Sequence, residues 1–163
     1  MDRDTLIAWL NNAHAMEREL IPVLRDHAND FRGMPAAQQR LDEHARETER
    51  HAERVRSAVE MLGGQISTLK TGSAIIAGNL LSVSTAFFSD ELAKDALMDY
   101  GAEQFEVGAY TALIAAAEEI EEPEVARLCR ENLREDEAMA EWLLRQVPKV
   151  VRKTLHEEAT TER

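Results

Sequence analysis

The chain has 163 residues, of which 44% are hydrophobic, and a formal net charge of −12 at pH 7. This length and composition allow one folded domain with a buried core and exclude a disordered chain. The negative charge disfavours nucleic acid and anionic membrane surfaces, whose phosphates it would repel, and is compatible with cation binding. Few glycines and prolines, with abundant Ala, Glu, Leu and Arg, predict an all-α protein.

Three further features concern the compartment. Cys129 is the single cysteine, which excludes an internal disulfide and fits a reducing environment. The chain does not begin with a basic segment followed by an apolar run, the pattern of a signal peptide. The most apolar stretch, residues 75–88, is broken by polar residues and is too short to cross a bilayer. We therefore expect a cytoplasmic protein without membrane or nucleic-acid partners.

Four long helical patterns follow one another along the chain, delimited by Pro, Gly and capping residues. The expected helices cover about residues 4–29, 35–63, 91–121 and 123–147. Between the second and the third lies a long crossover, residues 65–90, in which we expect a short helix over 73–88. The fourth helix is expected to stop before Pro148. Residues 1–148 would then form a single domain, and residues 149–163 a polar tail or a short extra helix.

The connections predict how these helices are arranged. A short loop, a long connection and another short loop define two helical hairpins joined by a crossover, as in a ferritin-like antiparallel four-helix bundle. The hairpins also resemble each other, because the segment 46–49 (Arg-Glu-Thr-Glu) matches the segment 134–137 (Arg-Glu-Asp-Glu). In that register Glu17 and Glu106 occupy nearly equivalent positions.

Glu17 is the acid whose position departs most from the apolar and polar pattern of its helix. At about 100° per residue, it falls in the middle of an apolar stripe on the first helix. The stripe consists of Leu6, Leu10, Ala13, Leu20 and Leu24. A carboxylate centred on such a face must be neutral, paired or bound to a metal, because an unpaired buried charge is too costly.

A carboxylate-bridged di-metal site in this fold takes one Glu from each of two helices and a Glu-x-x-His pair from each of the other two. The chain meets this template in part. The first helix offers Glu17, and the third offers Glu103 and Glu106 on one face. The central pair of the second helix is Thr48-x-x-His51 and that of the fourth is Asp136-x-x-Met139, so each half keeps one ligand type and lacks the other.

Further candidate ligands lie close to these positions. His44 and Glu47 form a second pair one turn earlier on the second helix. Glu47 and Glu135 lie near the edge of the inward face, where they could swing in or remain solvated. Without a metal, the buried acids must share protons or pair with His44, His51 or an arginine. The spacings thus predict an iron or manganese site with one or two ions, or its relic.

Three segments carry a resemblance to a known family. The run 99–110 (DYGAEQFEVGAY) resembles the third-helix signature of the YciE/YciF ferritin-like proteins, and it is the most specific of the three. The runs 135–143 (EDEAMAEWL) and 44–49 (HARETE) are similar to the fourth and second helices of that family. The resemblance extends from about Asp4 to Lys149.

The resemblance implies a ferritin-like bundle, usually dimeric, in a stress-associated protein with a di-iron type of site. By position, five residues match acidic positions of the family: Glu17, Glu47, Glu103, Glu106 and Glu135. His51 stands where the family often has Gln, and Gln104 where it often has His. These exchanges affect the ligand set and leave the expected fold unchanged.

Two functions therefore remain open at this stage. The first is a metal protein with a dinuclear iron or manganese centre and iron-oxidation or peroxide-handling chemistry, in which Tyr110 lies near the metal. The second is a non-catalytic homodimeric bundle with a degenerate site. Its interesting surface would be the small-residue face of the third helix, formed by Gln104, Gly108, Thr111 and Ala115. The apolarity of this helix on nearly all sides favours a partner subunit under either function. The sequence identifies neither the substrate nor a redox or stress partner.

Overall fold

The computed structural model describes residues 2–67 and 90–161, without the side chains of Arg32 and of residues 157–161. The main elements are α1 (Arg3–Asp30), α2 (Pro35–Met61), α4 (Glu91–Glu119) and α5 (Pro123–Thr161), and a 3-10 turn η1 (Phe31–Gly33) follows α1. No strand occurs in these two ranges. The expected helix over residues 73–88 lies outside the described residues.

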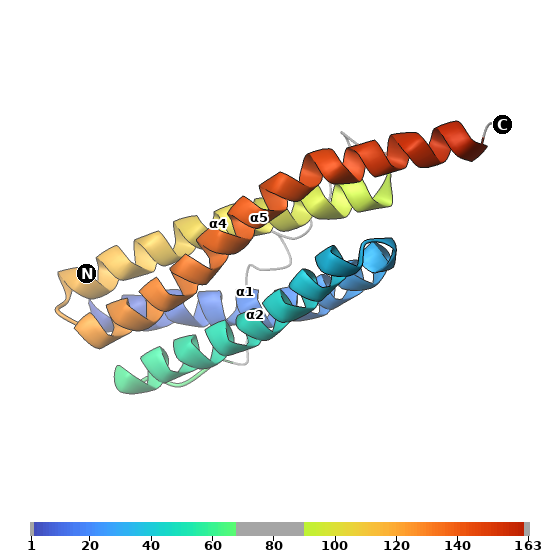
Figure 1. Cartoon of the computed structure of the whole chain (residues 1–163). Helices are drawn as coiled ribbons and strands as arrows, with labels where there is room; N and C mark the ends of the chain where they lie inside the picture. Colours follow the sequence, from blue (N-terminus) through green and yellow to red (C-terminus); the bar gives the residue numbers. More distant parts are fainter. Residues whose placement is uncertain (1, 68–89, 162–163) are drawn as a thin grey trace.

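The helices form two antiparallel hairpins that pack on each other. Figure 1 shows α1 beside α2 in one layer and α4 beside α5 in the other. α2 ends at one end of the bundle and α4 begins at the other, as expected for hairpins joined by a long crossover (Figure 1). The predicted all-α, ferritin-like four-helix bundle is therefore confirmed.

Local sequence explains where the helices begin. The side chain of Asp2 accepts a hydrogen bond from the backbone N–H of Thr5 at 2.8 Å, and Asp90 does the same for Ala93 at 2.9 Å. Both are N-caps that satisfy a donor left free by the first helical turn. Pro35 begins α2 at the position where its missing N–H costs nothing.

The predicted end of the fourth helix is wrong. α5 continues through Pro148 to Thr161, so residues 149–161 form neither a separate tail nor a separate helix. The turns on both sides of the proline pack against the bundle, because Val150 is fully buried and Val147 contacts the same core cluster. The last turns of α5 extend beyond the other helices (Figure 1).

The apolar core is divided into two clusters with a polar zone between them. One cluster contains Leu6, Leu10, Val55 and Leu113, and the other contains Leu24, Phe31, Leu41 and Leu143. The heptad positions of α2 face inward as predicted, since all are buried: Leu41, Ala45, Thr48, Ala52, Val55, Val59 and Leu62. Burial of each leucine stabilises the fold by about 1.5–3 kcal/mol. The two clusters enclose the polar zone and keep water away from its side chains.

Candidate metal centre

Carboxylates from α1, α4 and α5 and histidines from α2 meet in the polar zone between the core clusters. Six ionisable residues there are at most 2% exposed: Glu17, His44, His51, Glu103, Glu106 and Asp136. Glu17 comes from α1, both histidines from α2, Glu103 and Glu106 from α4, and Asp136 from α5. The predicted inward positions of Glu17 and of Asp136, from the central pair of the fourth helix, are confirmed because both side chains are fully buried.

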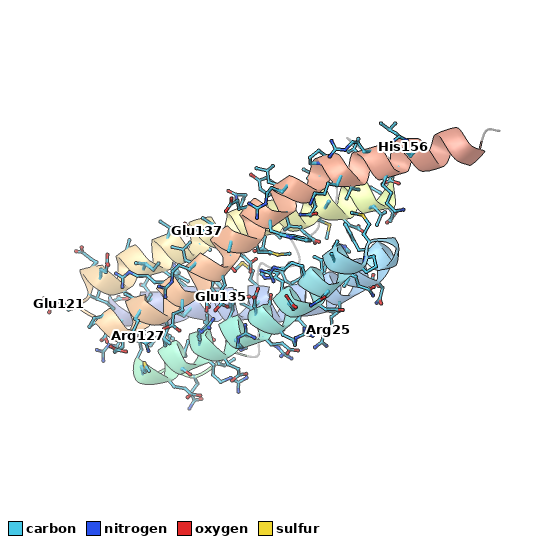
Figure 2. All side chains as sticks on the ribbon, in the orientation of Figure 1. Arg25, Glu121, Arg127, Glu135, Glu137 and His156 are labelled. Carbon is cyan, nitrogen blue, oxygen red and sulfur yellow. The ribbon has the colours of Figure 1, made fainter. Side chains whose placement is uncertain are left out.

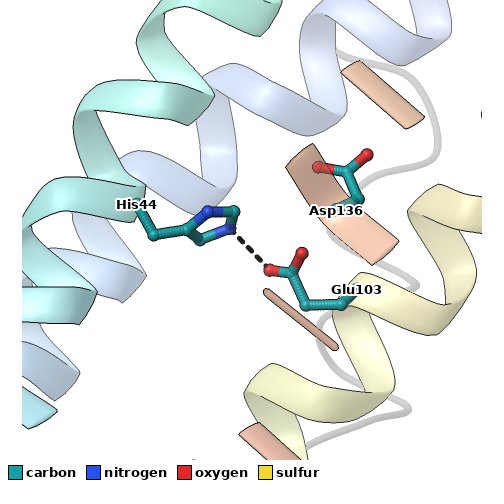
Figure 3. Close-up of side chains that lie close together, drawn as sticks. All are labelled: His44, Glu103 and Asp136. Carbon is teal, nitrogen blue, oxygen red and sulfur yellow. Dashed lines mark hydrogen bonds and ion pairs between the residues drawn. The ribbon is translucent and has the colours of Figure 1, made fainter. Parts of the chain in front are cut away.

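His44, Glu103 and Asp136 lie closest to a metal-binding arrangement. Each offers a ligand atom, and these atoms all lie within 4.8 Å of one another. The Nε2 atom of His44 lies 2.7 Å from Oε1 of Glu103. Figure 3 shows the three side chains converging from α2, α4 and α5. His44, a secondary candidate in the sequence, thus lies in the middle of the centre.

Glu17, His51 and Glu106 complete the cluster. The Nδ1 atom of His51 lies 3.6 Å from Glu17 Oε2 and 3.3 Å from Asp136 Oδ1. Glu106 is close enough to Glu17 and Glu103 for their charges to raise its pKa. The rings of His44 and His51, two helical turns apart on α2, have centroids 6.3 Å apart. The second half of the cluster therefore adjoins the first.

Glu47 and Glu135 lie behind the two histidines rather than among the buried carboxylates. Glu47 Oε2 is 2.9 Å from His44 Nδ1, and Glu135 Oε2 is 2.8 Å from His51 Nε2. Their side chains are 21% and 28% exposed, so both are half-buried at the edge of the bundle. Figure 2 shows Glu135 between α5 and α2, while Glu137 lies on the outer side of α5. Each carboxylate can fix the orientation of its imidazole ring.

Thr48 and Met139 stand at the two positions where the template has a ligand and this chain has none. Both side chains are buried. Thr48 donates its hydroxyl hydrogen bond to the carbonyl of His44 at 3.0 Å. Met139 is fully buried in one of the apolar clusters. His44 supplies the second imidazole that Met139 cannot supply, so four carboxylates and two histidines are still present. That number equals the set in di-metal carboxylate bundles, although its distribution over the helices differs.

A second layer of hydrogen bonds holds Glu17. The buried Tyr110 hydroxyl donates to Glu17 Oε1 and accepts a hydrogen bond from Asn132 at 2.8 Å. Arg54 donates to Asn132 at 2.9 Å and to both carboxylate oxygens of Glu135. The sequence reasoning missed Asn132 and Arg54. Asn132 had a signal, because it lies one turn before Asp136 on the inward stripe of α5.

Several buried polar atoms of the cluster have no hydrogen-bond partner. They are Glu17 Oε2, His51 Nδ1, Glu103 Oε2, Glu106 Oε1 and both carboxylate oxygens of Asp136. Buried polar groups are ordinarily satisfied, and an unsatisfied group destabilises a fold by about 1–3 kcal/mol. Oxygen ligands together with imidazole suit iron or manganese. The donor set and its free atoms therefore fit a hard metal ion.

Burial and mutual repulsion dominate the electrostatics of the acids. Burial, with the charges of Glu17 and Glu103, raises the pKa of Glu106 well above its usual range. Burial also raises the pKa of Asp136 well above its usual range, although His51 opposes the shift. At the edge, the hydrogen bond from His51 lowers the pKa of Glu135 to about 2 despite partial burial. The interior thus favours added protons or metal ions, whereas Glu135 stays ionised.

The pKa values of His44 and His51 are raised, although burial by itself would lower them. Burial alone lowers the pKa of an imidazole, but the charge of Glu103 and its hydrogen bond raise the pKa of His44 to about 10. For His51, burial is likewise outweighed by Glu135 and Glu17, which raise the pKa to about 9. The protein without metal therefore balances part of its buried negative charge with imidazolium ions.

The fold and the site together define a ferritin-like four-helix bundle with a buried carboxylate–histidine cluster. Residues 1–156 match the model of a family described as a domain of unknown function, DUF892. The chain belongs to this family. The suspected kinship with YciF-type ferritin-like proteins is confirmed by this match and by the structural neighbours.

Three solved structures show the same fold. A protein from Xanthomonas campestris pv. campestris is 30% identical, with a TM-score of 0.82 over 98% of this chain and 99% of the other. The Escherichia coli stress protein YciF is 22% identical, with a TM-score of 0.76 over 92% and 96%. The bacterioferritin of Desulfovibrio desulfuricans, solved with a diiron site, is 20% identical, with a TM-score of 0.74 over 92% and 82%. Among the described residues of the present chain, no helix is long and apolar enough to span a membrane.

Proposed function

We propose that this protein binds a dinuclear iron or manganese centre inside the bundle and acts as a ferritin-like, stress-associated protein. The observation that carries the proposal is the set of buried carboxylate oxygens without hydrogen-bond partners beside two histidines. Such a group of acids is costly unless protons or cations neutralise it. The diiron site named for the bacterioferritin and the stress role named for YciF support the same reading.

The chain's own residues divide into ligands and supports. His44, Glu103 and Asp136 would hold one ion, and Glu17, His51 and Glu106 would face the second. Glu47 and Glu135 would orient the two imidazoles through the ring nitrogen that points away from the metal. When bound, two iron ions supply redox chemistry suited to oxidising Fe(II) or handling peroxide.

Tyr110 and Asn132 support the α1 side of the centre. The Tyr110 hydroxyl donates a hydrogen bond to Glu17, and the Asn132 amide N–H donates one to the hydroxyl oxygen. Burial, with the charges of Glu17 and Asp136, raises the pKa of Tyr110 well above its usual range. The phenol therefore stays protonated and holds one oxygen of Glu17, while the other oxygen remains available to a metal.

Metal content tests the proposal directly. Protein from iron- or manganese-supplemented cells is expected to contain about two ions per chain, and anaerobic Fe(II) should raise the melting temperature. Binding to the native state alone stabilises by about 2.7 kcal/mol at a ligand concentration of 100 times Kd. Asp136→Asn should lose metal, whereas Glu137→Gln, one residue away on the exposed side of α5, should bind normally.

A second candidate, the non-catalytic bundle with a degenerate site, is favoured by one feature. The cluster already pairs internally, because His44 contacts both Glu103 and Glu47. Under this candidate the protein remains metal-free and its melting temperature does not respond to Fe(II). Asp136→Asn would then be neutral or stabilising, since it removes a buried charge.

We also propose that the chain forms a homodimer through the outer face of α4. This face carries no charged side chain between Tyr100 and Ala117, since Glu103 and Glu106 point inward. Its exposed positions are Gln104, Phe105, Gly108, Thr111, Ala112 and Ala115. A helix that is apolar on nearly all sides favours burial by a partner, and small residues permit close approach.

A further inference from the structure

Four buried carboxylates follow one another along the inward face of α4. Asp95, Asp99, Glu103 and Glu106 are three or four residues apart, so each lies about one helical turn from the next. All four are buried, and each has one carboxylate oxygen without a hydrogen-bond partner. Glu103 and Glu106 belong to the central cluster. Asp95 and Asp99 lie outside it, toward the beginning of α4.

His27 of α1 contacts both outer carboxylates. Its Nδ1 atom lies 2.6 Å from Asp99 Oδ1, and its Nε2 atom lies 3.5 Å from Asp95 Oδ1. The side chains of His27 and Asp95 are 10% and 8% exposed, whereas that of Asp99 is 3% exposed. The three residues thus form a group, which we name the outer triad, that reaches the surface at His27 and Asp95. At its inner side, the charge of Asp99 acts on Glu103.

The two carboxylates of the outer triad carry more negative charge than its single histidine can balance. No lysine or arginine is among the buried side chains of the described residues, so the buried counter-charges are histidines. The carboxylates of the central cluster, when ionised, match the charge of two divalent cations. In the outer triad, however, Asp95 and Asp99 face one imidazolium, so one negative charge is left over when both carboxylates are ionised. A divalent cation in place of the His27 proton would balance it.

A surface pocket beside the centre suits a cation less well. A pocket of about 400 Å³ between α2 and α5 lies next to Glu47 and Glu135. Its acids are engaged by guanidinium groups, since Arg40 contacts Glu47 and Arg54 contacts Glu135. These positive charges cancel the attraction for a metal ion. Within residues 2–67 and 90–161, no lysine or arginine forms an ion pair with the outer triad, and Asp99 lies one helical turn from Glu103 on α4.

We propose that His27, Asp95 and Asp99 form a binding station for one divalent metal ion, from which ions pass along α4 to the central cluster. In the structure the two carboxylates face opposite nitrogens of the His27 ring, so holding one ion requires side-chain rotations that bring both to the same nitrogen. This inference rests on the proposed metal function, because a path along α4 needs a centre to supply. The class of ligand is a hard divalent cation, such as Fe²⁺ or Mn²⁺.

Mn²⁺ binding to the metal-free full chain tests the station. The probe is the EPR signal of free Mn²⁺, which reports both the number of ions bound and the speed of uptake after mixing. We expect the wild-type chain to bind one weaker equivalent in addition to the central ions. Asp95→Asn/Asp99→Asn should lose that equivalent, keep the central ions and take them up about tenfold more slowly, because a charged path accelerates cation arrival.

Controls separate the station from the centre and from general charge. Glu91→Gln removes one negative charge near the start of α4, as Asp99→Asn alone does, but its carboxylate is 70% exposed and pairs with Lys94, so uptake should not change. Asp99→Asn alone serves if the double variant loses its helical circular dichroism. Unchanged stoichiometry and uptake in the aspartate variants, with central ions bound, would overturn the station alone. A wild-type chain that binds no Mn²⁺ or Fe²⁺ contradicts the proposed function as well.

Discussion

At the scale of single residues, the charge of the buried interior depends on which group carries each proton. His27 illustrates this most simply, because it lies outside the central cluster. Burial alone would lower its pKa, but the hydrogen bond to Asp99 and the charges of Asp99 and Asp95 outweigh burial and raise the pKa to about 9. Burial raises the pKa of Asp95 to about 7, although His27 opposes this. Both groups hold protons more tightly in the folded protein than in the unfolded chain.

The metal-free protein should therefore become less stable as the pH rises. The contribution of His27 is fully present below its unfolded pKa, about 6.5, and is lost as the pH rises through about 9. The shift of Asp95 has the same sign over lower pH, between its usual 3.8 and about 7. Melting temperatures measured in EDTA from pH 6.5 to pH 9.5 test this loss of stability. His27→Gln should lower the melting temperature at pH 6.5 more than at pH 9.5.

A wild-type melting temperature that rises from pH 6.5 to 9.5 contradicts the assignment. Glu135 has the opposite sign, because His51 lowers its pKa to about 2, but its contribution is lost only in acid. It does not disturb the comparison above pH 6.5.

At the scale of the elements, α2 and α4 end in the same way. The N–H of Gly64 donates to the carbonyl of Val59, and that of Glu122 to Ala117, both at 2.9 Å. These bonds form the helix-ending motif that places the preceding residue in the left-handed region. That residue is Gly63 in one hairpin, with φ 79°, and Glu121 in the other, with φ 60°. This shared ending is independent of the repeat, because α2 is the second helix of one hairpin and α4 the first helix of the other.

Glycine exchanges at these two positions should have opposite effects. Glu121→Gly removes the strain of a side chain at positive φ and should stabilise by about 0.5–1 kcal/mol. Gly63→Ala should destabilise by about 1 kcal/mol for backbone reasons alone, since no atom lies within 4 Å of the added Cβ position. Urea unfolding of both variants gives the two values.

At the scale of the whole molecule, the outer face of α4 is exposed in the single chain although it carries no charged side chain. Phe105 is 45% exposed in the middle of this face. The opposite side of the same helix carries the carboxylates of the centre. A partner subunit on the outer face would therefore hold α4 firmly against the metal centre, which connects the proposed dimer to the proposed site.

A charge introduced at the small residue of this face should separate the subunits. Gly108→Arg places a long cation where close helix approach is required, and an unpaired charge is costly to bury. Light scattering after size exclusion should give the mass of a dimer for the wild type and of a monomer for the variant. Glu137→Arg introduces the same side chain on the exposed side of α5 and should remain dimeric. A monomeric wild type, or an unchanged mass for Gly108→Arg, would falsify this assignment.

The fold was accessible from the sequence because helix periodicity and loop lengths are local properties. Glu17 and Asp136 were visible as inward acids for the same reason, since each interrupts an apolar stripe of its own helix. Pro148 was misjudged because a local rule ends a helix at proline. Packing of Val147 and Val150 on the bundle overrides that rule.

The sequence by itself determined the existence of the four main helices, their inward faces and the acids of the central cluster, but it did not single out the buried Asp95 and Asp99. Only the tertiary structure decided which of these residues meet. It placed His44 between Glu103 and Glu47, placed Glu135 behind His51, and brought His27 to Asp95 and Asp99 from 68 and 72 residues away in the chain. The physical reason is that contacts between helices depend on their relative rotation and sliding. Spacing along one helix does not contain that information.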